Sequence, residues 1–428
     1  MTHTDYTKNI LNIKDENIYF YDDCLKINEI KGVKTKIFHG YLTYIPESCP
    51  KCGCVNKSSD DIIKWNFKRN CKIKVTRVCG FNALLLLDKQ RFYCKHCNKT
   101  FTATTNFVDF HKQISYDTHT SVILDLMSKS SEKDIAKRNN ISTNSVNRIL
   151  DEISNDTIVK NNGLLPEILG IDEFSATKDT ISKLAFIIVD QTNRNIFDIN
   201  HSRKSLDINK YFRNYSKKER DKVKFITLDL YKPYYKLMHS LFRNAILIPD
   251  RFHIVIQARN ALDKTRINLC KKSNPNYKKL KKYWKLLLKD KRDLDKKKKK
   301  YQTCFKKEMT QYDIVSYLLN TNEELYETYQ IYQSILYSID TRNKEIFLSI
   351  INGKNKKISK YMKKALKTFR NMKKYILNAF DYEYSNGIVE GTNNLIKQIK
   401  HTAYGYRKFK HLKARVMLIK GLYNPIKA

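Results

Sequence analysis

Short apolar runs separated by polar turns dominate the middle of the chain. Such runs predict strands, and amphipathic stretches between them predict helices. The expected elements, in order, are strands at 168–174, 184–190 and 195–201, a helix at 206–215, a strand at 223–229, a helix at 234–242 and a strand at 245–248. This is the order of a ribonuclease-H-like α/β fold, in which the first and fourth strands lie side by side.

Two of these strands end on an aspartate. Asp172 follows the apolar run of the first strand and Asp229 follows that of the fourth, so the expected strand order brings the two carboxylates together. Glu173 points to the opposite face of its strand, because successive side chains alternate. We therefore do not count Glu173 as a ligand and expect Asp172 and Asp229 to share one acidic site.

One helix near the C-terminus has a strongly polar face. When residues 385–407 are wound as a helix, that face carries Glu390, Asn393, Asn394, Lys397 and His401. The apolar positions gather on the opposite face, so the polar side chains are expected to point away from the core. A lone acid on such a face is usually just solvated.

Asp172, Asp229 and Glu390 form a set with a specific chemistry. Two adjacent strands that end on aspartate, followed by a helix that carries a glutamate, build a three-carboxylate site for two divalent metal ions. Such a site, with two Mg²⁺ or Mn²⁺ ions, cleaves and joins the phosphodiesters of nucleic acids. The sequence therefore predicts these three acids as catalytic metal ligands.

Asp250 and His253 follow the last predicted strand and open the next helix, where they share a face. They could position a DNA end or support the metal ligands as accessory residues. An N-terminal capping role explains Asp250 more simply. Both interpretations fit the sequence.

Residues 131–150 have the pattern of two short helices. A capped helix begins at Ser131, a turn follows at 139–140, and a second helix begins near Ser142. The apolar spacing is typical of a helix-turn-helix, although an ordinary pair of packed helices has the same core. The residues that the second helix would present to the DNA major groove are Thr143, Asn144, Ser145, Asn147 and Arg148.

Two pairs of cysteines precede this unit, and each pair is separated by two residues. Such spacing favours a structural Zn²⁺ site of the ribbon type over four buried thiols. The long gap between the pairs predicts strands there. Cys54 and His96 are alternative ligands. The expected zinc ligands are Cys49, Cys52, Cys94 and Cys97.

The net charge of the chain indicates the kind of partner that it binds. The 428 residues include 82 Lys and Arg against 43 Asp and Glu, a formal net charge of +39. A polyanion is expected, double-stranded DNA before a membrane surface, and we expect Asn393, Asn394 and Lys397 to contact it.

The chain lacks the pattern of a signal peptide and any apolar run long enough to cross a bilayer. We expect a cytoplasmic protein associated with the nucleoid, with cysteines that are not in disulfides.

The fold class expected from these patterns is multidomain α+β. The lysine-rich stretch between Asp229 and Glu390 is too long for a loop and predicts an all-α insertion that clamps DNA. Within it, the run 296–300 is expected to form a solvated helix face.

Residues 161–163 resemble a linker. The expected domains are an arm (1–44), a zinc ribbon (45–110), a helix-turn-helix domain (111–160), the first part of the catalytic domain (161–266), the insertion (267–380) and the C-terminal part of the catalytic domain (381–428).

Several motifs together resemble the bacterial ISL-three family of insertion-sequence transposases, from residue 49 to about 415. The motifs are Cys-Pro-x-Cys-Gly at 49–53, Arg-Phe-x-Cys-x-x-Cys at 91–97, Gly-Ile-Asp-Glu-Phe at 170–174, Asp-Arg-Phe-His at 250–253 and Ser-Asn-Gly-x-Val-Glu-Gly-x-Asn-Asn at 385–394. The resemblance implies a DDE catalytic domain with Asp172, Asp229 and Glu390 as its triad. It also implies action on terminal inverted repeats and target DNA, for which we expect a dimer or higher oligomer. The motif at 250–253 resembles one shared with Mutator-like transposases.

Two other functions fit parts of the pattern. One is a domesticated zinc-ribbon and helix-turn-helix regulator that binds DNA without cutting it, and the intact set of carboxylates argues against it. The other is a structure-specific nuclease with no joining step. Two N-terminal DNA-reading modules favour sequence-specific recognition of DNA ends instead.

Overall fold

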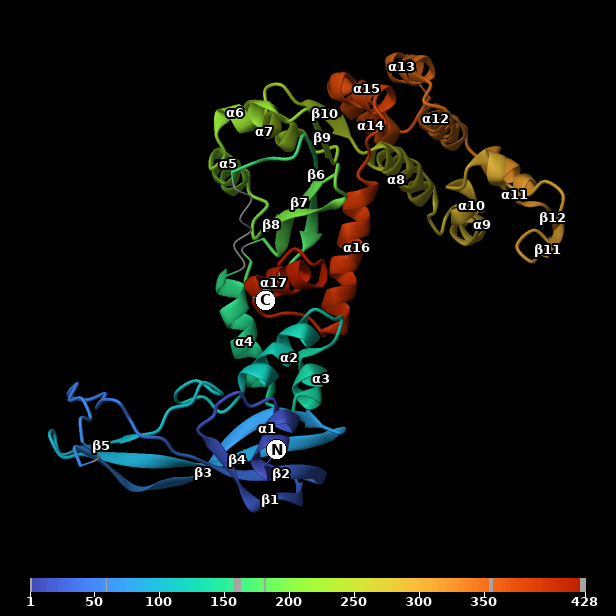
Figure 1. The fold of residues 1–428 in the computed structure, drawn as a ribbon. Helices are drawn as coiled ribbons and strands as arrows, with labels where there is room; N and C mark the ends of the chain where they lie inside the picture. The colour runs from blue at the N-terminus through green and yellow to red at the C-terminus, as the bar shows by residue number, and fades with distance from the viewer. Residues whose placement is uncertain (1, 59, 157–162, 181, 354–356, 424–428) are drawn as a thin grey trace. The chain divides into compact units, whose positions relative to one another are not determined.

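The computed structural model describes residues 2–58, 60–156, 163–180, 182–353 and 357–423 (Figure 1). The expected linker residues Asn161 and Asn162 lie outside them. The chain divides into two compact units. Unit 1 comprises Met1–Val159, Thr177–Asp179 and Ile396–Ala428, and unit 2 comprises Lys160–Ala176 and Thr180–Leu395. Each unit is built around its own buried apolar residues.

Unit 1 begins with a five-stranded sheet of order β1-β2-β4-β3, in which β5 also pairs with β4. Its elements are α1 (His3–Leu11), β1 (Ile18–Ile30), β2 (Val33–Leu42), β3 (Ile62–Val78), β4 (Phe81–Cys94) and β5 (Lys99–Thr102). The strands β2 and β4 run parallel and join the two hairpins β1–β2 and β3–β4. The sheet therefore includes residues on both sides of position 44, the expected boundary between the N-terminal arm and the zinc ribbon.

A helical cluster completes unit 1. Its helices are α2 (Tyr116–Leu126), α3 (Glu132–Arg138), α4 (Thr143–Asp156) and α17 (Phe409–Ile419). The last of these comes from the C-terminus and shares one core with the other three. Arg415 on α17 is 1% exposed and donates hydrogen bonds to three carbonyl oxygens at the end of α2 and just after it, those of Leu126, Ser128 and Ser130. These bonds satisfy carbonyl groups at the helix end and the buried guanidinium at once.

Unit 2 contains the strands that the sequence predicts. They are β6 (Ile168–Ser175), β7 (Leu184–Asp190), β8 (Asn195–Asn200), β9 (Phe225–Leu228) and β10 (Ile246–Pro249), and the sheet order is β10-β9-β6-β7-β8. The first and fourth strands, β6 and β9, are adjacent and parallel, as expected. The connections carry α5 (Ser205–Arg213), α6 (Lys217–Asp221) and α7 (Lys232–Leu241).

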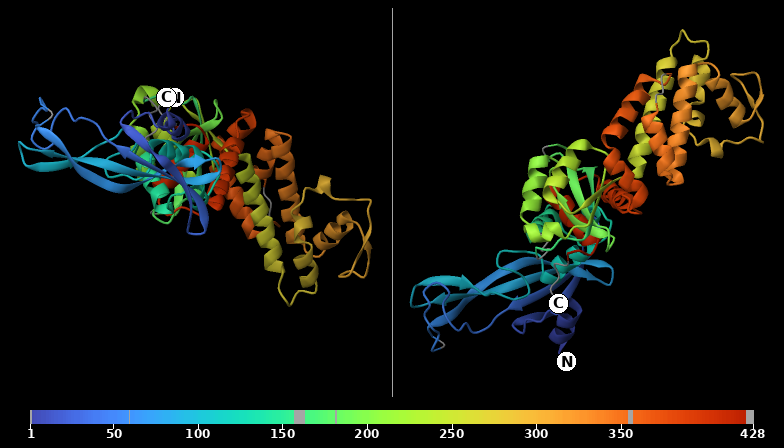
Figure 2. Two further views of the ribbon diagram at one scale, coloured as in Figure 1. Left: turned by 60° about the horizontal axis from the view of Figure 1, so that its bottom comes forward. Right: turned by 90° about the horizontal axis from the view of Figure 1, so that it is seen from above.

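The lysine-rich segment after β10 is mostly helical. Its helices are α8 (Arg251–Leu269), α9 (Tyr277–Lys282), α10 (Trp284–Leu287), α11 (Gln311–Leu319), α12 (Glu323–Asp340), α13 (Lys344–Asn352), α14 (Lys360–Asn371) and α15 (Lys373–Asp381). The long helix α8 packs against both α12 and α14 (Figure 2). A hairpin of β11 (Lys300–Gln302) and β12 (Lys307–Met309) corrects the expectation that this segment is all-α.

The lysine run 296–300 also differs from the expectation. Its first four lysines lie in an exposed loop and Lys300 begins β11. In the loop, Asp295 accepts hydrogen bonds from the backbone N–H groups of Lys297 and Lys298. This turn satisfies backbone donors locally, and the run has no apolar position that a helix could bury. The run therefore forms a loop instead of a helix face.

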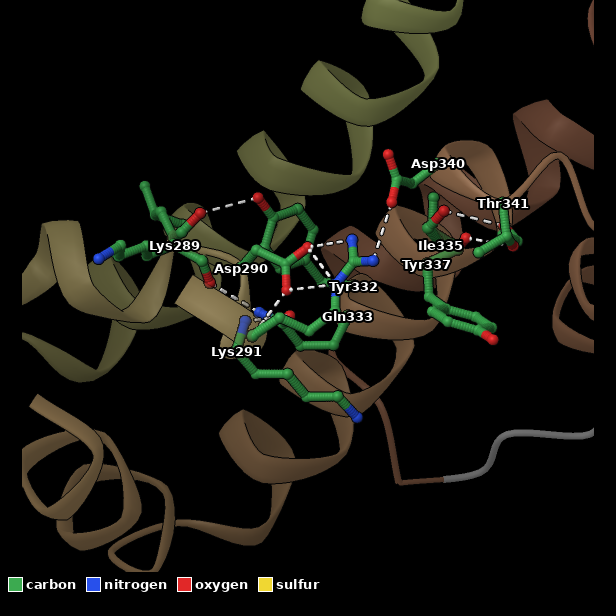
Figure 3. Close-up of polar contacts among 12 residues, drawn as sticks. Lys289, Asp290, Lys291, Tyr332, Gln333, Ile335, Tyr337, Asp340 and Thr341 are labelled. Carbon is green, nitrogen blue, oxygen red and sulfur yellow. Dashed lines mark hydrogen bonds and ion pairs between the residues drawn. The ribbon is translucent and has the colours of Figure 1, made fainter. Parts of the chain in front are cut away.

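Polar contacts fix the start of this loop to α12 (Figure 3). The amide of Gln333 donates to the carbonyl of Lys289 and accepts from the N–H of Lys291, at 2.9 Å each. Arg292 lies between Asp290 (2.7 Å) and Asp340 (2.8 Å). The segment between α10 and β11 is therefore held by side-chain hydrogen bonds to one helix face.

The helix α16 (Gly387–Thr402) follows α15, which packs on β10. Gly387–Leu395 belongs to unit 2. Among the described residues, none of the helices has the length and apolarity required to cross a bilayer.

Candidate active site

Asp172 and Asp229 lie at neighbouring positions on the sheet of unit 2. The parallel ladder of β6 and β9 ends with Gly170 paired to Thr227, and each aspartate lies two residues beyond its member of that pair. Burial raises the pKa of Asp172. Burial, reinforced by the negative charge of Asp172, raises the pKa of Asp229 to about 7. Two carboxyl groups so placed favour any cation that enters between them.

His253 and Asp250 join these two aspartates. Asp250 caps α8, since one carboxylate oxygen, Oδ1, accepts a hydrogen bond of 3.2 Å from the backbone N–H of Phe252. His253 Nδ1 lies 3.3 Å from Asp250 Oδ2 and 3.1 Å from Asp229 Oδ1. The hydrogen bond with Asp250 raises the pKa of His253. Asp250 therefore has the capping role that the sequence suggested, and His253 contacts both its other carboxylate oxygen and Asp229.

Asn393 of α16 reaches the same group. Its Nδ2 donates a hydrogen bond of 2.7 Å to Asp172 Oδ2, and the residue is 7% exposed. The sequence prediction placed Asn393 on an outward face that contacts DNA, and its burial corrects that placement. A polar side chain can be buried when a carboxylate accepts its hydrogen bond.

A glycine lets α16 approach the sheet closely. A Cβ added at Gly170 on β6 would lie 2.5 Å from Val389 Cγ2 and 2.7 Å from Gln191 Nε2. Val389 on α16 is fully buried. Only glycine at position 170 therefore leaves space for this packing of the helix.

Buried hydrogen bonds fix the start of α16. Thr227 donates to Asn386 Oδ1 at 2.5 Å, and Asn386 Nδ2 donates to the carbonyl of Ile171 at 3.3 Å. Gln191 Nε2 donates to Thr227 Oγ1 at 2.6 Å and to the carbonyl of Ser385 at 3.0 Å. This network connects the residues flanking Asp172 and Asp229 with the segment that carries Asn393.

Glu390 is exposed on α16. It precedes Asn393 by three positions, which is about one helical turn. Among the described residues, it belongs to neither group of side chains that the structure gathers closely enough to hold a metal ion. Asn394 and Lys397 are exposed. The structure thus brings Asp172 and Asp229 together with Asp250, His253 and Asn393, while Glu390 lies outside that group.

Glu173, which the alternation of side chains predicts not to be a ligand, has partners of its own. It accepts hydrogen bonds from Arg203 at 2.8 Å and from the hydroxyl of Tyr234. These contacts tie its carboxylate to the loop before α5 and to α7.

The chemistry of the acidic group fits a divalent cation. Ligand atoms of Asp229, Asp250 and His253 all lie within 4.8 Å of one another. Asp229 Oδ1 and Asn393 Oδ1 are buried oxygens without a hydrogen-bond partner among the described residues. Oxygen donors in this arrangement suit Mg²⁺ or Mn²⁺.

The four predicted cysteines gather in unit 1, and their sulfurs lie within 4.8 Å of one another. The Sγ atoms of Cys49 and Cys97 are 3.8 Å apart, as are those of Cys52 and Cys94. Zn–S bonds of about 2.3 Å in a tetrahedral site separate the sulfurs by about 3.8 Å. The cluster is therefore compatible with structural zinc.

The surroundings of one of the four cysteines, Cys49, favour its thiolate form. Burial raises the pKa of the Cys49 thiol, but hydrogen bonds from the backbone of Lys51 and Cys52 outweigh burial and lower that pKa to about 7. Cys54 and His96 are not members of the cluster. The Cys54 thiol is instead 3.7 Å from the carbonyl of Val55.

The helices α3 and α4 have the core that the sequence predicts, with Ile135, Ala136 and Val146 buried. Of the predicted DNA-reading residues on α4, Thr143, Asn144 and Arg148 are exposed, while Ser145 and Asn147 are half-buried. Ser145 and Arg148 line a cavity of about 640 Å³ together with Lys74, His111 and His119, among others.

Comparison with known proteins identifies the family. A protein from Lactococcus lactis subsp. lactis described as an ATP-dependent protease is 36% identical to this chain over 125 residues, which is 28% of this chain and 40% of that protein. The chain thus spans less than half the length of that relative. The sequence model of the ISL3-type DDE family, described as transposase, matches residues 169–416, which is more than half of the chain and includes every residue of the acidic group. The chain belongs to the ISL-three family of transposases.

Proposed function

We propose that the protein is the DDE transposase of a bacterial insertion sequence, which binds terminal inverted repeats and catalyses metal-dependent DNA cleavage and strand transfer. The observation that carries the proposal is the parallel pairing of β6 with β9, because it sets Asp172 beside Asp229 at the carboxyl ends of two adjacent strands. The family match supports the same activity.

Asp172, Asp229, Asn393 and Glu390 each have a role in this proposal. Asp172 and Asp229 would hold the Mg²⁺ or Mn²⁺ ions together with the third carboxylate, and two such ions would supply activation of the attacking hydroxyl and stabilisation of the leaving oxygen. Asn393 orients the carboxylate of Asp172 through its 2.7 Å hydrogen bond. Glu390 is retained as the third catalytic carboxylate because it is one helical turn from Asn393 on the same helix.

The remaining parts hold the DNA. In this proposal, α3 and α4 read the terminal repeat as a helix-turn-helix, and Thr143, Asn144 and Arg148 offer exposed side chains for that contact. The cysteine cluster folds the zinc-ribbon domain (45–110) around a structural Zn²⁺. The insertion and the exposed Asn394 and Lys397 contact phosphates, since the excess of positive charge favours an extended DNA interface.

The test is cleavage and joining of a labelled duplex that ends in the element's terminal repeat, with Mg²⁺ or Mn²⁺ present. Wild-type protein is expected to produce nicked and joined products, and Glu390→Gln is expected to bind the duplex without cutting it. Glu345→Gln, at an exposed position on α13, is the matched control and keeps activity. Full activity of Glu390→Gln contradicts the assignment of the third carboxylate. Tight binding without a cut by wild type indicates a DNA-binding regulator instead.

A further inference from the structure

His253 lies where a ligand of a shared metal ion would lie. Its Nδ1 is 3.1 Å from Asp229 Oδ1 and 3.3 Å from Asp250 Oδ2. Bonds of about 2.1 Å to an octahedral ion place neighbouring ligand atoms about 3.0 Å apart. The two separations from His253 Nδ1 therefore match those of adjacent ligands around one ion.

The hydrogen bonds of this group leave one oxygen unsatisfied. His253 Nδ1 has hydrogen-bond geometry toward Asp250 Oδ2. Its contact with Asp229 Oδ1 is an ion-pair distance without that geometry, and Asp229 Oδ1 is a buried atom with no hydrogen-bond partner among the described residues. A single proton on Nδ1 can therefore satisfy only one of the two carboxylates, whereas a cation satisfies both.

A second unsatisfied oxygen belongs to the side chain that binds Asp172. Asn393 is more than nine-tenths buried, and its Oδ1 has no partner among the described residues while its Nδ2 is bound to Asp172. Asp172 in turn interacts electrostatically with His253. Asp229, which directly follows β9, and Asn393 on α16 thus each carry a buried, unpaired oxygen, and a bound ion with its water ligands would account for both.

Asp250 divides its two oxygens between two tasks. Oδ1 caps α8 through the N–H of Phe252, and Oδ2 faces His253. The cap fixes the first turn of α8, and the spacing of three residues brings His253 to the same side as Asp250. The helix terminus therefore presents an oxygen and a nitrogen to Asp229 in fixed positions.

We propose that Asp229, Asp250 and His253 form a divalent-metal site with an imidazole ligand, and that this ligand makes the site prefer Mn²⁺ to Mg²⁺. Imidazole nitrogen suits transition metals, whereas Mg²⁺ selects carboxylate, carbonyl and water oxygens. The inference rests on the proposed function only for the role of the ion in cleavage, because metal binding is measured without DNA.

The experiment titrates Mn²⁺ into the zinc-loaded, full-length protein and follows the electron paramagnetic resonance signal of free Mn²⁺. Mg²⁺ affinity follows from competition. The wild type is expected to bind Mn²⁺ about tenfold or more tightly than Mg²⁺. Spin-echo modulation of the bound Mn²⁺ is expected to show coupling to a nitrogen of a directly bound imidazole.

Three variants test whether His253 binds the metal ion directly or is only a cationic partner of the two aspartates. His253→Gln is expected to lose the nitrogen coupling and the preference for Mn²⁺. Asp250→Asn preserves a helix cap, because asparagine is an equally good capping residue, and is expected to lose Mn²⁺ affinity about tenfold or more. His239→Gln, at an exposed position on α7, is the matched control and keeps both properties. Circular dichroism checks that each variant is folded.

Each outcome is informative. Nitrogen coupling that disappears in His253→Gln supports the site even if the protein cuts no DNA, in which case the proposed function fails alone. Mn²⁺ bound without nitrogen coupling, or with unchanged affinity in both His253→Gln and Asp250→Asn, overturns the inference. His253 would then be a cationic partner of the two aspartates.

Discussion

Asn393 Nδ2 donates a hydrogen bond of 2.7 Å to Oδ2 of Asp172, although 221 positions separate the two residues in the chain. The bond restrains one of the two carboxylates that the sheet brings together. It also ties α16 to β6 at the point where the proposed chemistry takes place.

Asn393→Ala is therefore expected to slow DNA cleavage about 10- to 100-fold, the usual effect of removing a partner that orients a metal ligand. DNA affinity should change little, because the side chain is buried. Single-turnover cleavage and gel-shift titration measure the two effects separately. The exposed neighbour is the control, since Asn394→Ala should weaken binding and leave the rate at saturating DNA unchanged. Equal cleavage rates for wild type and Asn393→Ala would argue against this role.

Gly170→Ala is expected to destabilise unit 2 by about 1–3 kcal/mol, because the added methyl group meets Val389 at 2.5 Å. Thermal and urea unfolding measure the loss. The double variant Gly170→Ala with Val389→Ala should be more stable than the sum of the two single changes predicts. Gly391→Ala is the control, since nothing lies within 4 Å of a methyl group there. It should stabilise α16 by about 0.5–1 kcal/mol.

Zinc content tests the cysteine cluster. Wild-type protein is expected to contain zinc, and Cys94→Ser should lose it together with the cooperative unfolding of the sheet in unit 1. Mass spectrometry of the metal content gives the stoichiometry. Cys54→Ser should retain zinc, because that thiol lies outside the cluster. Equal loss from the two variants would point to a different ligand set.

Low pH is expected to weaken the packing of α17 on α4. Hydrogen bonds from Lys410 and His411, together with Lys408, hold the pKa of Asp151 far below its usual range. A lowered native pKa stabilises the fold above the unfolded pKa of about 4, and this stabilisation is lost as pH falls below that value. The difference in urea midpoint between wild type and Asp151→Asn should therefore be largest at pH 5–7 and shrink toward pH 2. A difference that is constant with pH would exclude this ionic contribution.

The loop at 296–300 offers a test of DNA contact by the insertion. Its lysines are exposed, so the triple change of Lys297, Lys298 and Lys299 to Gln should leave the fold intact. If each lysine neutralises a phosphate, the slope of log affinity against log salt falls by up to about 3. Gel shifts at several salt concentrations measure that slope. An unchanged slope would place the loop away from DNA.

The strands of unit 2 were predictable because each is a compact apolar run between polar turns. The pattern of apolar runs did not predict the strands within residues 1–44, because most of β1 is exposed on both faces and shows no clean alternation. Helical periodicity also could not reveal that Asn393 is buried, because it cannot identify which polar residue of a face meets a carboxylate from another element. The Gly170–Val389 contact could have been expected from the sequence, because a glycine within an otherwise apolar strand often marks a close approach by another part of the chain.

His253 illustrates a different limit. Its spacing from Asp250 was visible in the sequence, yet the contact with Asp229 depends on β10 pairing beside β9. Packing of α17 on α4 was equally hidden, because charges at 151 and 408–411 carry no information about contacts over that sequence distance. The lysine run was assigned to a helix from composition alone, and composition does not reveal a turn.

The hydrogen bond from Thr227 to Asn386 has a consequence for how the protein is made. Its two residues are 159 positions apart, and Asn386 also binds Ile171 across 215 positions. At synthesis rates of about 5–20 residues per second, both aspartates leave the ribosome on the order of ten seconds before the segment that joins them to α16. A nascent chain therefore carries an unfinished acidic site throughout synthesis of the insertion, and any product that terminates early lacks the helix that holds Asp172.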